Sequence, residues 1–96
     1  MIKHVVLWKF KEENKKENMQ KAREMLLALI PIISEIKSMK VYFDISGTDM
    51  SADVMLDTEF SSEADLKTYA VHPEHLKVAE FMKSVILSRV VLDSEI

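Results

Sequence analysis

The chain has 96 residues, 48% hydrophobic and 30% charged, a composition typical of one small globular domain spanning residues 1–96. Its net charge of −3 and its mixed signs argue against a nucleic-acid surface, which needs a clustered basic stripe. The absence of cysteine excludes disulfides, thiolate catalysis and the common zinc sites, and one glycine cannot make a glycine-rich phosphate loop. No apolar run approaches the ~20 residues that span a bilayer, and the start lacks a signal-peptide pattern. We therefore expect a cytoplasmic protein without membrane partner, metal or cofactor.

Residues 2–10 alternate as a β-strand does. The more apolar face carries Ile2, His4, Val6, Trp8 and Phe10. We expect this face to meet the helices. Apolar residues then recur at helical spacing from Met19 to Ile33, which predicts a helix over roughly residues 15–30. Pro31 should kink or end that helix, and we expect irregular structure through Ile36.

The rest of the chain adds three strands and a broken helix. Residues 39–45 and 52–60 alternate again, around a turn at residues 46–49. Ser61 or Ser62 can cap the next helix, which breaks at Pro73, and residues 85–93 predict the last strand. The order βαββαβ predicts an α+β fold, a ferredoxin-like sandwich with helices on one face of an antiparallel sheet.

That architecture leaves one sheet face without a helical cover. Val5, Leu7 and Met55 should lie on it, with part of the last strand. An apolar sheet centre open to solvent usually marks a partner surface, so we expect a homodimer in which two sheets pack face to face. Acidic residues on the third strand, Asp57 and Glu59 among them, argue against this pairing.

The segment from Tyr69 to His75 concentrates the polar chemistry of the chain. It holds two of the three histidines and one of the two tyrosines. Pro73 pushes the residue before it out of helical geometry and suits the first turn of a new helix. The segment thus predicts a helix, a corner at His72 and a second helix with His75 on the face of Ala79 and Met82.

Tyr69 and His75 are the candidate catalytic residues. A neutral histidine in an apolar pocket suits removal of a proton next to a carbonyl, and a tyrosine hydroxyl suits binding of the resulting oxyanion. Both residues can equally be structural, Tyr69 as a core aromatic and His75 as a packing residue. The candidate ligand pocket around them comprises His4, Val6, Trp8, Leu56, His72, Val78 and Ala79. Among these, His72 beside the proline suits a structural role at the corner.

Four segments resemble the stress-responsive α/β-barrel (Dabb) family. They are residues 1–10, residues 35–39, residues 59–75 with the His72-Pro73-Glu74-His75 motif, and residues 89–93. The resemblance covers nearly the whole chain and implies pairing as a dimeric α+β barrel. It extends distantly to a plant polyketide cyclase of the olivetolic acid type, an aldol-forming enzyme whose catalytic tyrosine and histidine match Tyr69 and His75, with a further histidine matching His4.

The match to the cyclase has departures that bear on function. A histidine on the cyclase's third strand is replaced by Val54, a frequent glycine is replaced by Tyr42, and Trp8 projects toward the pocket. Three hypotheses stay open: cyclase- or lyase-type acid–base chemistry on a small carbonyl compound, a non-catalytic dimer that binds a small apolar molecule, and a monooxygenase-like dimeric barrel. Only fold-level analogy supports the third.

Overall fold

The computed structural model describes all 96 residues and contains one four-stranded antiparallel sheet with helices on one side. Its elements follow one another as β1 (Ile2–Phe10), α1 (Lys15–Leu27), β2 (Ser38–Phe43), β3 (Val54–Phe60), α2 (Glu63–Val71), α3 (Pro73–Val85) and β4 (Ile86–Glu95). The spatial strand order is β2-β3-β1-β4. The ferredoxin-like prediction is therefore confirmed, with the second helical segment broken at Pro73.

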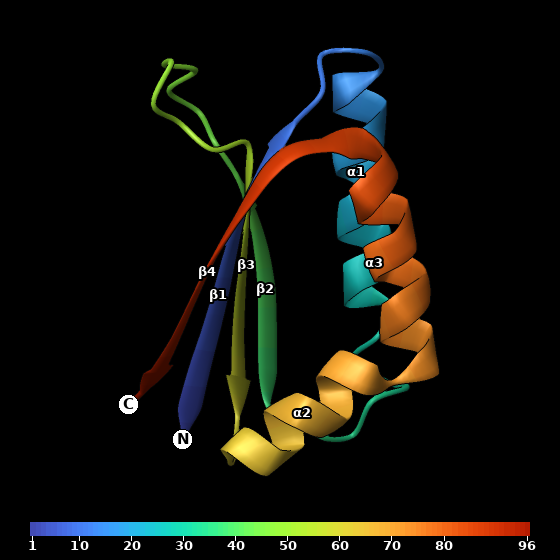
Figure 1. The fold of residues 1–96 in the computed structure, drawn as a ribbon, viewed down its shortest axis with the longest axis vertical. Coiled ribbons are helices and arrows are strands. Elements are labelled where there is room, and N and C mark those ends of the chain that lie inside the picture. The colour runs from blue at the N-terminus through green and yellow to red at the C-terminus, as the bar shows by residue number, and fades with distance from the viewer.

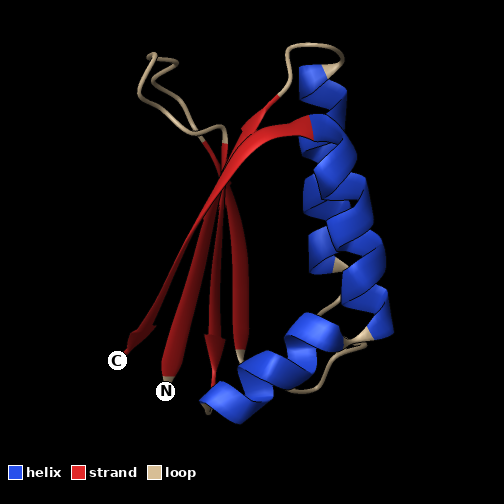
Figure 2. Ribbon diagram, viewed as in Figure 1, coloured by secondary structure: helices blue, strands red, loops and turns tan.

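The molecule has two layers, the sheet and the helices (Figures 1 and 2). In β3, buried and half-buried residues alternate without exception, because successive side chains point to opposite faces of a sheet. Val54, Leu56, Thr58 and Phe60 point toward the helices and are buried. The single core lies between the layers, where α1 and α3 pack beside one another and α2 crosses one end (Figure 1).

Several elements end earlier than the sequence pattern predicts. The helix predicted to residue 30 stops at Leu27, four residues before Pro31. If the helix continued, the Pro31 ring would clash with the Leu27 carbonyl. Turns follow as far as Ile36, as predicted. β2 ends at Phe43 rather than residue 45, because the Asp44 carboxylate accepts from the Gly47 N–H at 2.7 Å and closes a turn.

The corner between α2 and α3 is fixed by its own side chains. Ser62 caps α2 by accepting from the Asp65 N–H at 3.1 Å. His72 is extended, with φ −62° and ψ 133°, and Pro73 occupies the first position of α3. The His72 Nδ1 accepts from the Glu74 N–H at 3.1 Å and so caps α3. The proline therefore sets where the helix breaks, and the histidine stabilises the break.

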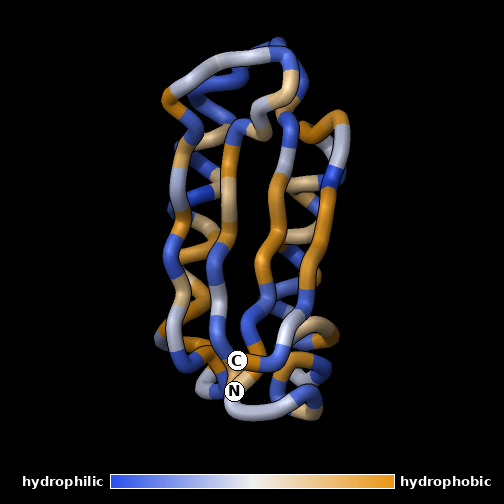
Figure 3. The backbone as a smooth tube through the Cα atoms, turned by 90° about the vertical axis from the view of Figure 1, so that its left-hand side faces the viewer, coloured by the Kyte–Doolittle hydropathy of each residue, from blue (hydrophilic) through white to orange (hydrophobic).

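The sheet face turned away from the helices is apolar at its centre. Leu7, Val90 and Leu92 are exposed on β1 and β4, and Val5 and Met55 are half-buried beside them. Figure 3 looks onto the strand layer and shows hydrophobic colour along two adjacent strands. None of the helices is both long and apolar enough to cross a bilayer.

Candidate functional site

A cavity of about 270 Å³ lies between the helix-facing side of the sheet and the helices. Most of its lining is apolar, as ligand pockets usually are. It is lined by His4, Val6, Trp8, Leu26, Leu56, Tyr69, His75, Val78, Ala79, Met82, Lys83, Ile86 and Arg89. A broader groove of about 880 Å³ runs outside it between α2 and the β1–β4 edge. His4, Tyr69, His75 and Arg89 line both spaces, so these four polar residues stand where the groove meets the cavity.

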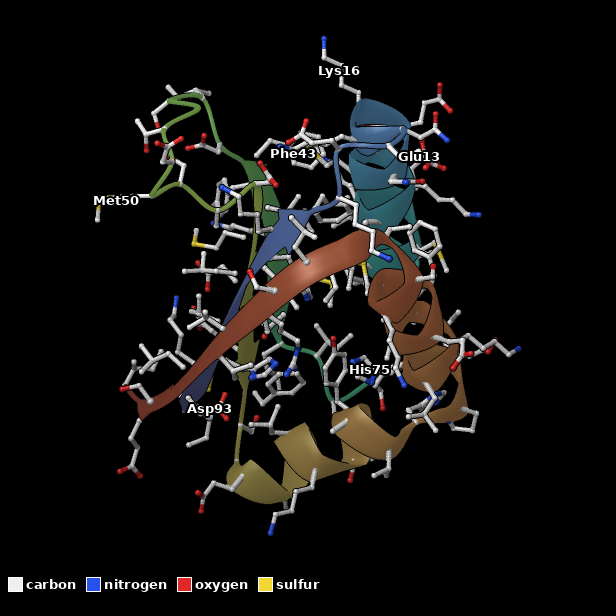
Figure 4. The ribbon with its side chains drawn as sticks, turned by 45° about the horizontal axis from the view of Figure 1, so that its top comes forward. Glu13, Lys16, Phe43, Met50, His75 and Asp93 are labelled. Carbon is white, nitrogen blue, oxygen red and sulfur yellow. The ribbon has the colours of Figure 1, made fainter.

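Tyr69 and His75 are brought into ring contact by the corner. Tyr69 lies near the end of α2 and His75 in the first turn of α3, and their ring centroids are 4.4 Å apart. The His75 Nδ1–H donates to the Ala70 carbonyl oxygen at 3.0 Å, since a carbonyl can only accept. That bond leaves Nε2 as the lone-pair nitrogen of the neutral ring. Figure 4 shows His75 between the helices and the sheet.

The environment of His75 favours the neutral imidazole. Burial is the main cause that lowers the pKa of His75, and the positive charges of His4, Arg89 and His72 lower it further. The hydrogen bond to Ala70 opposes these effects in part. A histidine that stays neutral around neutral pH, with a free Nε2, can accept a proton.

The Tyr69 side chain is buried and polar yet unpaired. It is 1% exposed, and its hydroxyl has no hydrogen-bond partner in the protein. Burial raises the pKa of Tyr69 far above its ordinary value, against a smaller opposing effect of the Arg89 charge. The phenol is therefore protonated at any physiological pH and available as a donor. Unpaired buried hydroxyls are rare because they are costly, and one that lines a cavity can be completed by a ligand, a water or a reacting group.

His4 is oriented by a residue from the far end of the chain. β1 and β4 pair so that His4 stands directly opposite Asp93, and both point toward the helix layer. The His4 Nδ1–H donates to the Asp93 carboxylate, an arrangement that leaves Nε2 without a proton in the neutral ring. The His4 and Tyr69 rings meet edge to face with centroids 6.3 Å apart. The site thus brings two imidazole rings next to one phenol ring.

Trp8 lines the cavity without filling it. The indole is 5% exposed and its Nε1–H has no hydrogen-bond partner in the protein. The side chain leaves the cavity open beside it. The size of that cavity, close to the lower end of the range of about 300–1,000 Å³ usual for ligand pockets, restricts the enclosed part of any ligand to a small molecule.

The structure places most of the predicted site residues around this cavity. They are His4, Val6, Trp8, Leu56, Tyr69, His75, Val78 and Ala79. His72 lines neither the cavity nor the groove, because its ring is engaged in capping α3, so its placement in the pocket is corrected.

Sequence reasoning missed three charged residues around the site, of which Arg89 and Asp93 lie on the last strand. Both belong to β4, and strand alternation puts them on one face together with Val91. That signal is present in the sequence, but only the pairing of β4 with β1 shows which face is turned inward. Leu26, Met82, Lys83 and Ile86 complete the lining that was not predicted.

The comparisons with known proteins identify the family and the fold. The family model of the stress-responsive A/B barrel domain (Dabb) matches residues 2–96. A dimeric protein of unknown function with a ferredoxin-like fold from Bacteroides fragilis shares 30% identity, with 99% of this chain and 95% of that chain covered and a TM-score of 0.91.

Two more distant structures share the fold. A dimeric ferredoxin-like protein of unknown function from Thermobifida fusca has 18% identity, with 99% and 90% of the chains covered and a TM-score of 0.88. A hydroxynitrile lyase from Passiflora edulis has 20% identity, with 97% and 90% covered and a TM-score of 0.86. No curated protein sequence gives a significant match. The dimeric neighbours support a homodimer.

Proposed function

This chain belongs to the stress-responsive A/B barrel family, and we propose that it is an acid–base catalyst of the cyclase or lyase type that acts on a small carbonyl compound. One observation carries the proposal: the buried, unpaired Tyr69 hydroxyl belongs to a ring that contacts His75, beside a small apolar cavity. A donor for a developing oxyanion and an acceptor for a proton are the two groups that such chemistry needs.

In the bond-forming direction the reaction begins at a carbon next to a carbonyl. His75 Nε2 takes the proton from that carbon, and the C–H electron pair becomes an enolate whose oxygen accepts from the Tyr69 hydroxyl. The enolate carbon then attacks a second carbonyl, a C–C bond forms, and the new alkoxide takes the proton back from His75. Every proton is returned, so no oxidant, metal or cofactor is consumed.

The lyase direction reverses these steps, and His75 again moves the proton. His75 Nε2 removes the hydroxyl proton of the substrate, the C–C bond breaks as the C=O bond forms, and the departing carbanion is protonated by His75. His4, held by Asp93, presents its unprotonated Nε2 to the same space, where it can accept a hydrogen bond from the substrate hydroxyl. A protein of closely similar fold is a hydroxynitrile lyase, which supports lyase chemistry on this scaffold as a proposal for this chain.

Proton exchange provides the most direct test, because it requires only the first step. We would incubate the protein with acetophenone in deuterium oxide and follow loss of the methyl proton signal by NMR, and in parallel follow release of benzaldehyde from mandelonitrile by absorbance. Tyr69→Phe and His75→Asn should each remove the enzyme-dependent rate. Tyr42→Phe, which alters the exposed second tyrosine, is the matched control and should retain it.

A negative result in both assays, with binding of the ketone still detectable, would favour the non-catalytic alternative. The protein would then be a dimer that binds a small apolar molecule. Retention of exchange by Tyr69→Phe would instead remove the tyrosine from the mechanism and leave the histidines as the reacting groups.

We further propose that two copies pair through the sheet face that the helices leave open. The acidic residues that argue against this pairing are all partnered: Lys3 contacts Asp57 at 3.0 Å and Glu59 at 3.2 Å. Asp53 contacts Lys15 at 3.0 Å and turns its other oxygen to the Phe10 N–H. The exposed apolar residues of β1 and β4 are then free to meet their copies.

Sedimentation of Val90→Glu tests this interface. Val90 is 62% exposed on the open face, and a charge placed there should give monomers that keep their fold by circular dichroism. Val71→Glu is the control, because Val71 is 69% exposed on α2 in the other layer. A Val90→Glu protein that sediments as a dimer would place the interface elsewhere.

A further inference from the structure

The polar lining of the cavity consists, apart from the two histidines, of groups that can each donate a hydrogen bond. They are the Trp8 indole, the Tyr69 hydroxyl, the Lys83 ammonium and the Arg89 guanidinium. No aspartate or glutamate lines the cavity, although the chain has 16 acidic residues and a net charge of −3. Two of the donors, Trp8 and Tyr69, are buried and lack a partner in the protein. A positive, donor-rich site in an acidic protein points to an anionic ligand rich in acceptors.

Arg89 is the charge best placed to meet such a ligand. It stands opposite Trp8 in the β1–β4 ladder and lines both the cavity and the outer groove. It forms no ion pair, and neither does Lys83. The acid on the same strand face, Asp93, lies four positions further, about 13 Å along an extended strand, and is hydrogen-bonded to His4. The exposed guanidinium therefore has no ion-pair partner at the junction of the two spaces.

We propose that the ligand is a small carbonyl compound bearing a carboxylate, and that Arg89 binds the carboxylate while the carbonyl oxygen lies toward Tyr69 and Trp8. The carbonyl part rests on the proposed function; the carboxylate part does not. Guanidinium binds a carboxylate through two parallel N–H···O bonds, which fixes orientation as well as charge. The apolar walls and the 270 Å³ volume suit a short hydrocarbon or aryl body between the two groups.

The outer groove explains why a monoanion is favoured over a phosphate ester. Glu63, Asp93 and Glu95 line the groove together with Lys67 and Arg89. The groove carries three carboxylates against two cations, so the second charge of a dianion at Arg89 would be less well matched on the groove side than a single charge is, while Lys83 lines only the inner cavity. A carboxylate is therefore the anion that the charges of the site fit.

Trp8 gives a direct readout, because it is the only tryptophan of the chain and it lines the cavity. We would titrate the intact protein with benzoylformate and with its neutral isostere benzoylformamide, and follow quenching of the indole fluorescence. The carboxylate should bind at least about ten-fold more tightly than the amide, in line with the strength of charge-assisted hydrogen bonds. Inorganic phosphate, added as a competitor, should displace it poorly.

Variants separate recognition from folding. Arg89→Leu should weaken benzoylformate binding by about ten-fold or more and leave benzoylformamide unchanged, and Arg89→Lys should keep part of the difference. Arg23→Leu is the matched control, since it removes the only other arginine, which lies over the Phe43 ring on the surface. Equal affinity of the two probes, or equal weakening of both by Arg89→Leu, would overturn the proposal, as would efficient displacement by phosphate.

The outcome is independent of whether the protein turns anything over. Selective carboxylate binding without proton exchange would keep this inference and remove the proposed catalysis. Conversely, suppose that the protein exchanges protons of neutral ketones at a rate that Arg89→Leu leaves unchanged, and binds the carboxylate probe no more tightly than the amide. That result would keep the proposed catalysis and remove the carboxylate inference.

Discussion

Replacing Tyr69 by phenylalanine should raise stability and lower activity together. The change removes one hydroxyl, which is buried and has no partner in the protein. Burying such a group unsatisfied costs about 1–3 kcal/mol, so its removal should stabilise the fold by up to that amount. For a domain of this size, each 1 kcal/mol corresponds to roughly 4–8 °C in Tm. We therefore expect the melting temperature of Tyr69→Phe to rise by several degrees.

Tyr69→Phe should also cause a large loss of activity. Removing one oxyanion donor typically lowers kcat by about 10²–10³-fold. Differential scanning calorimetry and the proton-exchange assay on the same protein sample measure the two effects. If Tm falls by several degrees instead, the hydroxyl has a stabilising partner, and the functional interpretation of its unpaired state is refuted. Tyr42→Phe should leave both quantities nearly unchanged, because Tyr42 lines neither the cavity nor the groove and its hydroxyl is not buried in the core.

Three further predictions concern the histidines and their partners. Burial holds the pKa of folded His75 below the ordinary value of about 6.5, so unfolding in acid takes up a proton. The free energy of unfolding should therefore fall as the pH drops from about 6.5 toward the pKa of the folded state. Denaturant titrations of His75→Asn should show a smaller dependence on pH. Asp93→Asn should lower kcat/KM, measured by steady-state kinetics, by about ten-fold, because it releases the His4 ring. Unchanged kinetics would show that the His4–Asp93 contact has no part in catalysis. His72→Ala should lower the free energy of unfolding by about 1 kcal/mol through loss of the α3 cap, with turnover of the folded protein retained; loss of turnover would return His72 to the site.

Local patterns in the sequence determined which elements form and where the chain breaks. Alternation over residues 52–60 predicts β3, because strand geometry sends neighbouring side chains to opposite faces whatever the surroundings. Pro73 breaks the helix, because its ring excludes helical geometry from the residue before it. The same local reasoning placed Tyr69 and His75 on either side of one corner, within ring contact in the structure.

Tertiary structure alone decided which charged residues lie at the site. Asp93 reaches His4 across a separation of 89 residues, and Arg89 stands beside Trp8 through the same pairing of the first and last strands. No local periodicity encodes that register, because it depends on how the whole sheet closes. The size of the cavity beside Trp8 also depends on tertiary packing, because the cavity is the space that the side chains between sheet and helices leave empty. The sequence by itself thus determined the elements and the corner, and the folded arrangement decided the charge and the size of the site.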